Sequence, residues 1–145
     1  MFGAAAGKIV MEASKVVRAA DRATYGVLKK FGAFVRRTAR QSIRKRKKVS
    51  APGKPPTSRT GLLKKTIIFN ADPDRRNVII GPMKLNRRSE DAPFALEHGG
   101  MATIVRGSPT RPRRERKYIK ARPFMGPAMD ENLPKLPGMW RDSIK

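Results

Sequence analysis

Apolar and polar residues alternate with a helical period over the first third of the chain. Between Lys8 and Lys47, small or apolar residues recur at spacings near three and four, as on one face of an amphipathic helix, at Val10, Ala13, Val17, Ala20, Thr24, Val27, Phe31, Phe34, Val35, Thr38 and Ile43. The pattern predicts one helix over residues 8–47, about 55–60 Å long at about 1.5 Å per residue. Gly26 and Gly32 each cost about 1 kcal/mol relative to alanine, so we expect a kink or a close contact there.

The predicted helix is longer than a small core can cover. Part of its apolar stripe should therefore pack against a neighbouring subunit. Five consecutive cations mark its end, where they are favoured beside the carbonyl end of the helix dipole: Arg44, Lys45, Arg46, Lys47 and Lys48.

A basic arm rich in proline and glycine follows the helix over residues 48–61. Its residues exclude a helix or a central strand, because they include Pro52, Gly53, Pro55 and Pro56. Gly61 permits a tight turn into a strand that begins at Leu62.

Residues 62–122 predict a small antiparallel sheet of about four strands. Thr66–Phe69 and Asn77–Gly81 are β-type runs on either side of the turn at Asp72–Asp74, so they form a hairpin. We interpret the two aspartates of this turn as solvated rather than as a metal loop.

The rest of the sheet region is less regular. Ala92–His98 is a short element of either type, closed by Gly99 and Gly100. Met101–Val105 and Tyr118–Ile119 are the third and fourth strands. Between them, residues 106–117 predict a flexible basic loop, because prolines and cations dominate the segment.

The C-terminal part begins with a proline in a favourable position for a helix start. Pro123 predicts the start of a short helix segment over residues 123–134, in which Met125–Leu133 are helical and end before Pro134, followed by an irregular tail over residues 135–145. The whole pattern describes a single α+β domain. It has one long N-terminal amphipathic helix, a small antiparallel β-sheet of about four strands, a short C-terminal helix and long basic loops.

Composition adds constraints on what can stabilise this domain. The chain has 145 residues, of which 39% are hydrophobic, so its core must be small. There is no cysteine and a single histidine, so disulfides are excluded, and we expect no metal site and no cofactor. Oligomerisation is the remaining support for a small core. No apolar run is long enough to span a membrane and the N-terminus lacks a secretion signal, so we expect no membrane partner and synthesis in the cytoplasm.

Charge is the most unusual feature of the composition. The formal net charge is +23, from 34 Lys and Arg against 11 Asp and Glu. Clusters at residues 22–65 and 106–122 indicate a polyanionic partner, either nucleic acid or an acidic protein surface. The residues expected to contact it are Arg44, Lys45, Arg46, Lys47, Lys48, Lys54, Arg59, Arg111, Arg113, Arg114, Arg116 and Lys117.

Enzyme signatures are missing from the chain. It holds no phosphate-binding glycine loop, no zinc-protease motif, no nucleophile elbow and no cysteine nucleophile. Glu97 and His98 are neighbours, but adjacency alone does not orient an imidazole for catalysis. We therefore expect a protein that is not an enzyme and has no catalytic residues.

Four ordered segments carry a resemblance. Residues 51–67 begin with A-P and end with T-G-L-L-K-K-T-I, and residues 77–82 contain a "V-x-I-G" strand. Residues 92–100 read "A-P-F-A-L-E-H-G-G" and residues 121–129 read "A-R-P-F-M-G-P-A-M". In this order, after an amphipathic helix, they resemble a family of tailed-phage morphogenesis proteins described as head–tail joining, neck or tail-completion proteins. Phe94 stands where tyrosine is usual, and the basic segment 106–117 departs from the family pattern. The resemblance covers roughly residues 10–135.

Most residues of these segments are expected to determine the fold: Pro52, Gly61, Leu62, Gly81, Glu97, Gly99, Arg122, Pro123 and Phe124. Gly81 should end a strand, and Phe124 should insert into the core. Glu97 either pairs with Arg122 or another basic residue, or is a simple exposed acid.

The resemblance implies a structural virion protein of the neck or tail. It would form a homo-oligomeric ring of six or twelve copies around the DNA channel, between head-closure or portal-side proteins and the tail tube or tail terminator. Genomic DNA in the channel is a further candidate partner, bound without sequence preference.

Two other functions fit the composition. One is a free, sequence-independent nucleic-acid-binding protein, associated with the nucleoid or the ribosome. The other is a membrane-active cationic helix, which requires an apolar face free to bind lipid. Against the first, aromatic residues are few and those of the helix fall near its apolar stripe, so no base-stacking platform is evident.

Overall fold

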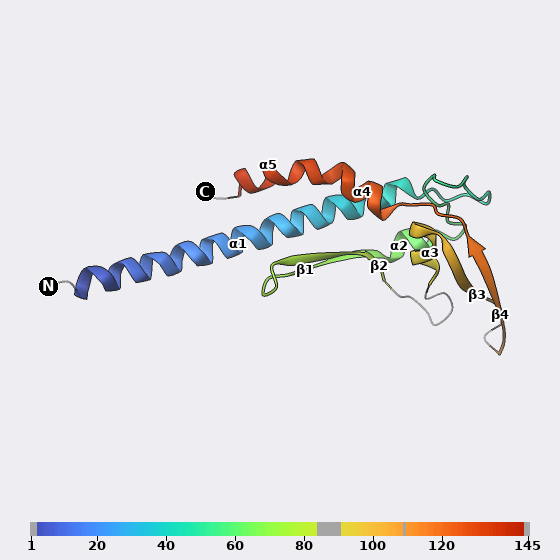
Figure 1. The fold of residues 1–145 in the computed structure, drawn as a ribbon, viewed down its shortest axis with the longest axis horizontal. Coiled ribbons are helices and arrows are strands. Elements are labelled where there is room, and N and C mark those ends of the chain that lie inside the picture. The colour runs from blue at the N-terminus through green and yellow to red at the C-terminus, as the bar shows by residue number, and fades with distance from the viewer. Residues whose placement is uncertain (1–2, 84–90, 109, 144–145) are drawn as a thin grey trace.

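The computed structural model in Figure 1 describes residues 3–83, 91–108 and 110–143, with side chains described from residue 13 onward. One long helix runs through most of its length, and two short C-terminal helices and a β-hairpin pack along this helix (Figure 1). In chain order the elements are α1 (Gly3–Ser42), α2 (Leu62–Thr66), β1 (Ile67–Asp72), β2 (Asn77–Pro82), α3 (Ala92–His98), β3 (Gly100–Ser108), β4 (Arg111–Ile119), α4 (Met125–Asn132), the 3-10 turn η1 (Leu133–Lys135) and α5 (Leu136–Arg141).

The core lies between α1 and the elements on both sides of it. α4 and α5 lie along one side of α1, and β1 and β2 lie along the other (Figure 1). The buried residues of α1, together with Ile43 just after it, lie four apart, so each lies next to the one before it and the buried face winds slowly around the helix: Val27, Phe31, Val35, Ala39 and Ile43. The partners of this face include Ile67, Phe124 and Ala128. The predicted α+β class with a long amphipathic helix is confirmed.

The N-terminal half of α1 extends beyond the other elements (Figure 1). Every side chain from Ala13 to Ala20 is exposed, and Val16 and Val17 are 68% and 54% exposed. Other elements begin to cover α1 at Asp21, which forms an ion pair of 2.8 Å with Arg76 in the turn between β1 and β2. The apolar stripe predicted for this helix therefore continues past the end of the core.

α1 ends at Ser42, five residues before its predicted end at residue 47. The hydroxyl of Ser42 donates to the carbonyl of Ala39 at 2.8 Å, and Ile43 turns into the core with 1% of its surface exposed. The five cations Arg44–Lys48 belong instead to the arm, which in the structure runs over residues 44–61. Adjacent like charges within one helical turn repel one another, which favours ending the helix before them.

The predicted single sheet of about four strands is wrong in its connectivity. The four strands form two separate antiparallel hairpins, β1 with β2 and β3 with β4. In the first hairpin, directly opposite residues share a face. Phe69 opposite Ile80 and Ala71 opposite Val78 lie on one face, and Val78 and Ile80 pack against the α1 core. The predicted runs Thr66–Phe69 and Asn77–Gly81 are thus confirmed as a hairpin.

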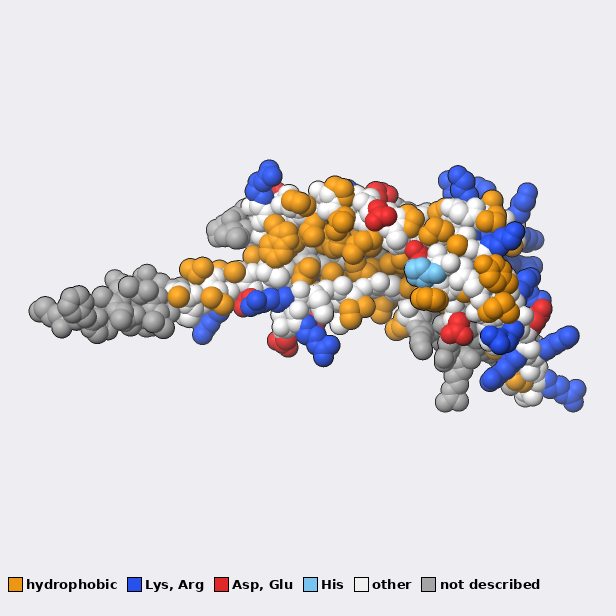
Figure 2. All heavy atoms as spheres, viewed as in Figure 1, with side chains coloured by type: hydrophobic (Ala, Val, Ile, Leu, Met, Phe, Trp, Pro, Cys, Tyr) orange, Lys and Arg blue, Asp and Glu red, His pale blue; other side chains and the backbone are white. Residues whose placement is uncertain are grey.

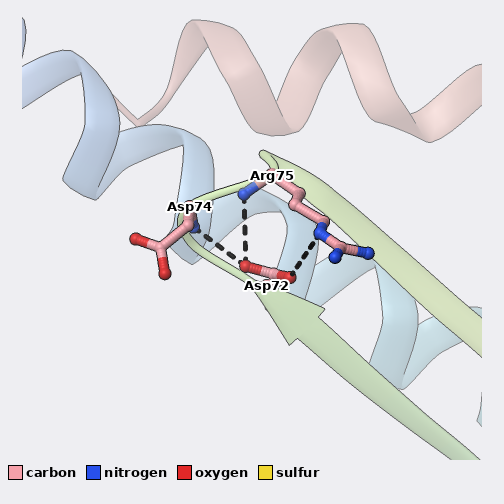
Figure 3. A network of polar contacts seen from close by, with 3 residues as sticks. All are labelled: Asp72, Asp74 and Arg75. Carbon is pink, nitrogen blue, oxygen red and sulfur yellow. Dashed lines mark hydrogen bonds and ion pairs between the residues drawn. The ribbon is translucent and has the colours of Figure 1, made fainter.

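The turn of the first hairpin is organised by Asp72 (Figure 3). One oxygen of its carboxylate accepts from the backbone N–H groups of Asp74 at 2.9 Å and Arg75 at 3.2 Å, and the other lies 3.8 Å from Nε of Arg75. The carboxylate of Asp74 is not part of this network (Figure 3). Asp72 is therefore a turn-forming residue of the kind that short acidic side chains provide.

The chain starts the first hairpin differently from the prediction. Leu62 begins the short helix α2, and the strand starts at Ile67. Gly61 has a φ of 75°, in the left-handed region where glycine is favoured, so the predicted need for glycine is confirmed although the element after it is a helix.

The basic loop predicted over residues 106–117 is wrong. Residues Arg111–Ile119 form β4, which pairs with β3 along its whole length, from Ser108 opposite Arg111 to Gly100 opposite Ile119. Both strands of a two-stranded ribbon are edge strands, where proline is tolerated, so Pro112 does not prevent pairing. The charged side chains of β4 remain in water on both faces of the ribbon.

The C-terminal tail is more helical than predicted. The short helix is confirmed as α4, but η1 and α5 continue to Arg141, so the prediction of an irregular tail over residues 135–145 is wrong within the described part. Pro134 and Pro137 each fall in the first two residues of a new helical segment, where the missing N–H has no partner to lose. Leu136 and Met139 pack back onto the core.

Candidate polyanion interface

The carboxylate of Glu97 holds the start of α4. Glu97 lies near the end of α3, and its two oxygens accept from three backbone N–H groups, those of Phe124 at 2.9 Å, Met125 at 3.0 Å and Gly126 at 2.7 Å. These donors have no partner within the helix, and a negative charge is favourable at this end of the helix dipole. The predicted pairing with Arg122 and the alternative of a simple exposed acid are both wrong.

Arg122 links the basic arm to the segment that follows β4. Its Nε donates to the carbonyl of Ser50 at 2.9 Å, and Nη1 donates to the carbonyl of Lys120 at 3.1 Å. A backbone bond of 2.9 Å from Gly53 to the carbonyl of Ala121 runs beside these contacts. Segments far apart in the sequence are therefore fixed against one another at this point.

The four segments singled out in the sequence form a continuous set of contacts. The N–H of Arg122 donates to the carbonyl of Leu96, which joins residues 121–129 to residues 92–100. Gly53 joins residues 51–67 to the same place, and the pairing of Ile67 with Pro82 adds residues 77–82.

The remaining residues of these segments take the following places. Gly99, with a φ of 78°, lies against the backbone of Ala121. Phe124 is 1% exposed in the core, as predicted, and Gly81 is the residue before the end of β2. Leu62 and Pro52 are exposed and Pro123 is half-buried.

The arm is a closed loop rather than a free extension. Arg44 forms an isolated bridge with Thr57, and Ser58 donates to the carbonyl of Arg44 at 3.0 Å. The hydroxyl of Thr57 donates to the carbonyl of Lys48 at 2.8 Å, and Pro56 is fully buried. The cations of the arm thus project from a loop whose two ends are fixed.

The structure brings residues 44–59 of the first basic cluster and the second cluster together at one end of the molecule. The arm follows the C-terminal end of α1, and the β3–β4 hairpin projects from the same end (Figure 1). Figure 2 shows lysine and arginine side chains gathered there. We call this surface the basic end. It comprises fourteen exposed cations: Arg44, Lys45, Arg46, Lys47, Lys48, Lys54, Arg59, Arg106, Arg111, Arg113, Arg114, Arg116, Lys117 and Lys120.

The hairpin presents positive charge on both of its faces. Successive side chains of a strand point to opposite sides. Arg113 and Lys117 therefore lie on one face of β4, and Arg114 and Arg116 lie on the other. Arg106 of β3 is directly opposite Arg113. Like charges in opposed positions of a sheet repel one another and destabilise it. An anionic partner would reduce this repulsion within the ribbon.

Little acid balances this charge. Glu115 is the only acidic residue within the stretches 44–59 and 106–120. The two ion pairs recorded among residues 3–83, 91–108 and 110–143 are Arg75 with Asp72 and Arg76 with Asp21, both at the turn of the first hairpin. The cations of the basic end are thus available to an external anion.

Sequence reasoning missed two members of the basic end. Arg106 and Lys120 flank the expected basic residues, and both are exposed. Extending the third strand from Val105 to Ser108 would have placed Arg106 opposite Arg113.

The groups considered for catalysis have separate roles. The ring of His98 lies 4.6 Å from that of Phe94, centroid to centroid, while the carboxylate of Glu97 is engaged at α4. Within the described part of the chain, no group of three or more His, Asp or Glu side chains could hold a metal ion. Of the helices described, none is both long and apolar enough to cross a membrane.

Comparison with known proteins adds no relative. No protein-family model, no curated protein and no solved structure matches the chain.

Proposed function

We propose that this chain is a non-enzymatic structural virion protein of a tailed phage. It forms an oligomeric ring in the head–tail connector, at the neck or tail-completion position, and joins the portal or head-closure side to the tail tube around the DNA channel. The observation that carries the proposal is the contact between the four segments that resemble the head–tail joining family. Hydrogen bonds connect residues 77–82, 51–67, 121–129 and 92–100 in space.

The uncovered half of α1 supports assembly into an oligomer. Val16 and Val17 are largely exposed on a helix that extends beyond its own core. Exposed apolar residues on a long amphipathic helix are typical of a surface that packs against another subunit. The small core of a chain with no disulfide points the same way. Six or twelve copies are the numbers that the resemblance implies.

The mass of the purified protein tests this proposal. Light scattering after nuclease treatment, at low and at high salt, should give one discrete oligomer, or a monomer that becomes one when portal-side or tail-tube proteins are added. The double variant Val16→Asn and Val17→Asn should lower the mass without unfolding the chain. Ile79→Asn is the control, because Ile79 is equally exposed, at 70%, on the first hairpin.

A free nucleic-acid-binding protein is the second candidate, and the basic end is the observation that favours it. It predicts a persistent monomer that associates only when nucleic acid is returned. That result, with an unchanged mass in the α1 variant, would replace the connector proposal.

A further inference from the structure

We infer that the basic end binds the phosphate backbone of duplex DNA without sequence preference, with the β3–β4 ribbon as its principal contact. The inference goes beyond assembly into a ring. It is carried by the charge and geometry of one end of the molecule, and it holds whether or not the chain forms a connector.

The charge on the ribbon is not explained by the fold. Every residue of β4 from Arg111 to Tyr118 is exposed, and this stretch holds five cations and one acid. The ribbon contacts the rest of the molecule mainly through α3, at its base. Cations on a projecting ribbon that buries little of its own surface stabilise nothing within the chain. Their opposed positions, Arg106 against Arg113, cost folding energy that an external polyanion would recover.

An acidic protein surface fits this end less well than nucleic acid. The centre of a protein interface is depleted of charge and enriched in aromatic and apolar residues. Here the charge occupies the projecting part, and the exposed apolar residues Met101 and Tyr118 lie opposite one another next to the base of the ribbon. Val49 is the exposed large apolar residue of the arm. Such a surface has no apolar centre to anchor a protein partner.

The shortage of aromatic residues favours a duplex over a single strand. Proteins that bind single strands stack successive bases on aromatic side chains. Tyr118 is the aromatic residue of the basic end, and one ring cannot serve successive bases. Cations without stacking rings are suited to phosphates that face outward, as they do along a duplex.

The dimensions of the ribbon suit a groove of the duplex. Strands of nine residues span about 30 Å, which is close to one turn of DNA. The major groove is about 12 Å wide and admits a two-stranded ribbon. A ribbon that enters the groove on edge, with the side of one strand toward the bases, turns one face toward each phosphate row. Arg113 and Lys117 would then serve one row, and Arg114 and Arg116 the other.

The arm supplies a second contact beside the ribbon. Gly53 and Arg122 fix it to the segment that leaves β4, so its cations keep their position relative to the ribbon. Two linked basic elements contact more of the backbone than either alone. Contacts to phosphates position a protein but do not read sequence, so no preference among sequences is expected.

The test compares two sets of four substitutions that remove the same charge from the full chain. The first set is in β4: Arg113→Gln, Arg114→Gln, Arg116→Gln and Lys117→Gln. The second is on exposed positions of α1: Lys15→Gln, Arg18→Gln, Arg22→Gln and Lys30→Gln. Binding to fluorescent duplexes of about three helical turns is measured by anisotropy between about 50 and 200 mM salt. Light scattering of each variant records its oligomeric state.

The β4 set should weaken binding by roughly tenfold or more at low salt, and should lower the slope of log K against log salt by about three to four. The α1 set should leave both nearly unchanged, and duplexes of different sequence should bind alike. Equal loss in both sets would overturn the inference, because net charge alone would then explain binding. Equal affinity for a poly-glutamate chain or for single-stranded DNA would overturn it in favour of those partners. If the α1 set changes the mass of the assembly but not the salt dependence of DNA binding, assembly and DNA binding depend on different surfaces. The ring proposal and the DNA-binding inference can then be refuted separately.

Discussion

Replacing Glu97 by glutamine should destabilise the protein, because this carboxylate satisfies three N–H groups at the start of α4. Glutamine keeps one acceptor oxygen and loses the charge, and its NH₂ group would face a backbone donor. A hydrogen bond to a charged group contributes about 1.5–3 kcal/mol to stability. The favourable charge at the helix N-terminus adds about 0.3–1 kcal/mol. Since Glu97 is only half-buried and its bond to Gly126 is exposed, we expect a loss at the lower end of the combined range, about 2 kcal/mol in the free energy of unfolding.

The assay is urea unfolding followed by circular dichroism, at one protein concentration because subunit association contributes to apparent stability. A loss of about 2 kcal/mol corresponds to a fall in Tm of about 8 °C at this chain length. Glu131→Gln is the matched control, since Glu131 is exposed near the other end of α4 and should change stability by less than about 0.5 kcal/mol. Equal effects of the two substitutions would refute the role given to Glu97.

Two further predictions concern glycines. Gly32→Ala should destabilise the chain by about 1–3 kcal/mol, because the added Cβ would lie 2.7 Å from Phe69 and 2.9 Å from Val78. Gly26→Ala should instead stabilise the chain by up to about 1 kcal/mol in the same urea assay, because no atom lies within 4 Å of the added Cβ. A stabilising Gly32→Ala would contradict the packing of the first hairpin on α1. Gly107→Ala should loosen the second hairpin, because Gly107 has a φ of 97° and its Cβ would lie 2.7 Å from the carbonyl oxygen of Arg111. Hydrogen exchange should then become faster in β3 and β4 only, and unchanged protection there would count against the pairing.

The parts of the fold that the sequence predicts well are those that bury one face. α1 repeats apolar residues at the helical period, and the first hairpin consists of two short β-type apolar runs on either side of a turn, so both are visible in the sequence. β4 is different, because its side chains are exposed on both faces from Arg111 to Tyr118 and leave no alternation to detect. Pro112 and the run of cations then favoured a loop.

The extent of the helical segments was harder to predict for a related reason. Proline usually ends a helix, but Pro134 and Pro137 lie at the second positions of η1 and α5, and α5 packs on α1. Tertiary packing decides this, and a local rule cannot supply it. The end of α1 was overestimated because the cations after Ser42 suit a helix end as well as a loop.

The sequence predicts the members of the basic end better than their arrangement. Both clusters are plain in the sequence, yet the bond from Arg122 to Ser50 that brings them together spans 72 residues. The role of Glu97 was also hidden. Its three partners are backbone N–H groups 27–29 residues away, which no side-chain pattern marks.

The proposed ring is tested most directly by electron micrographs of the nuclease-treated protein, alone and with portal-side or tail-tube proteins. The proposal predicts closed annular particles of one size with a central opening, because head-to-tail contacts that close by rotation form rings. Monomers under every condition, or open filaments of variable length, would contradict it.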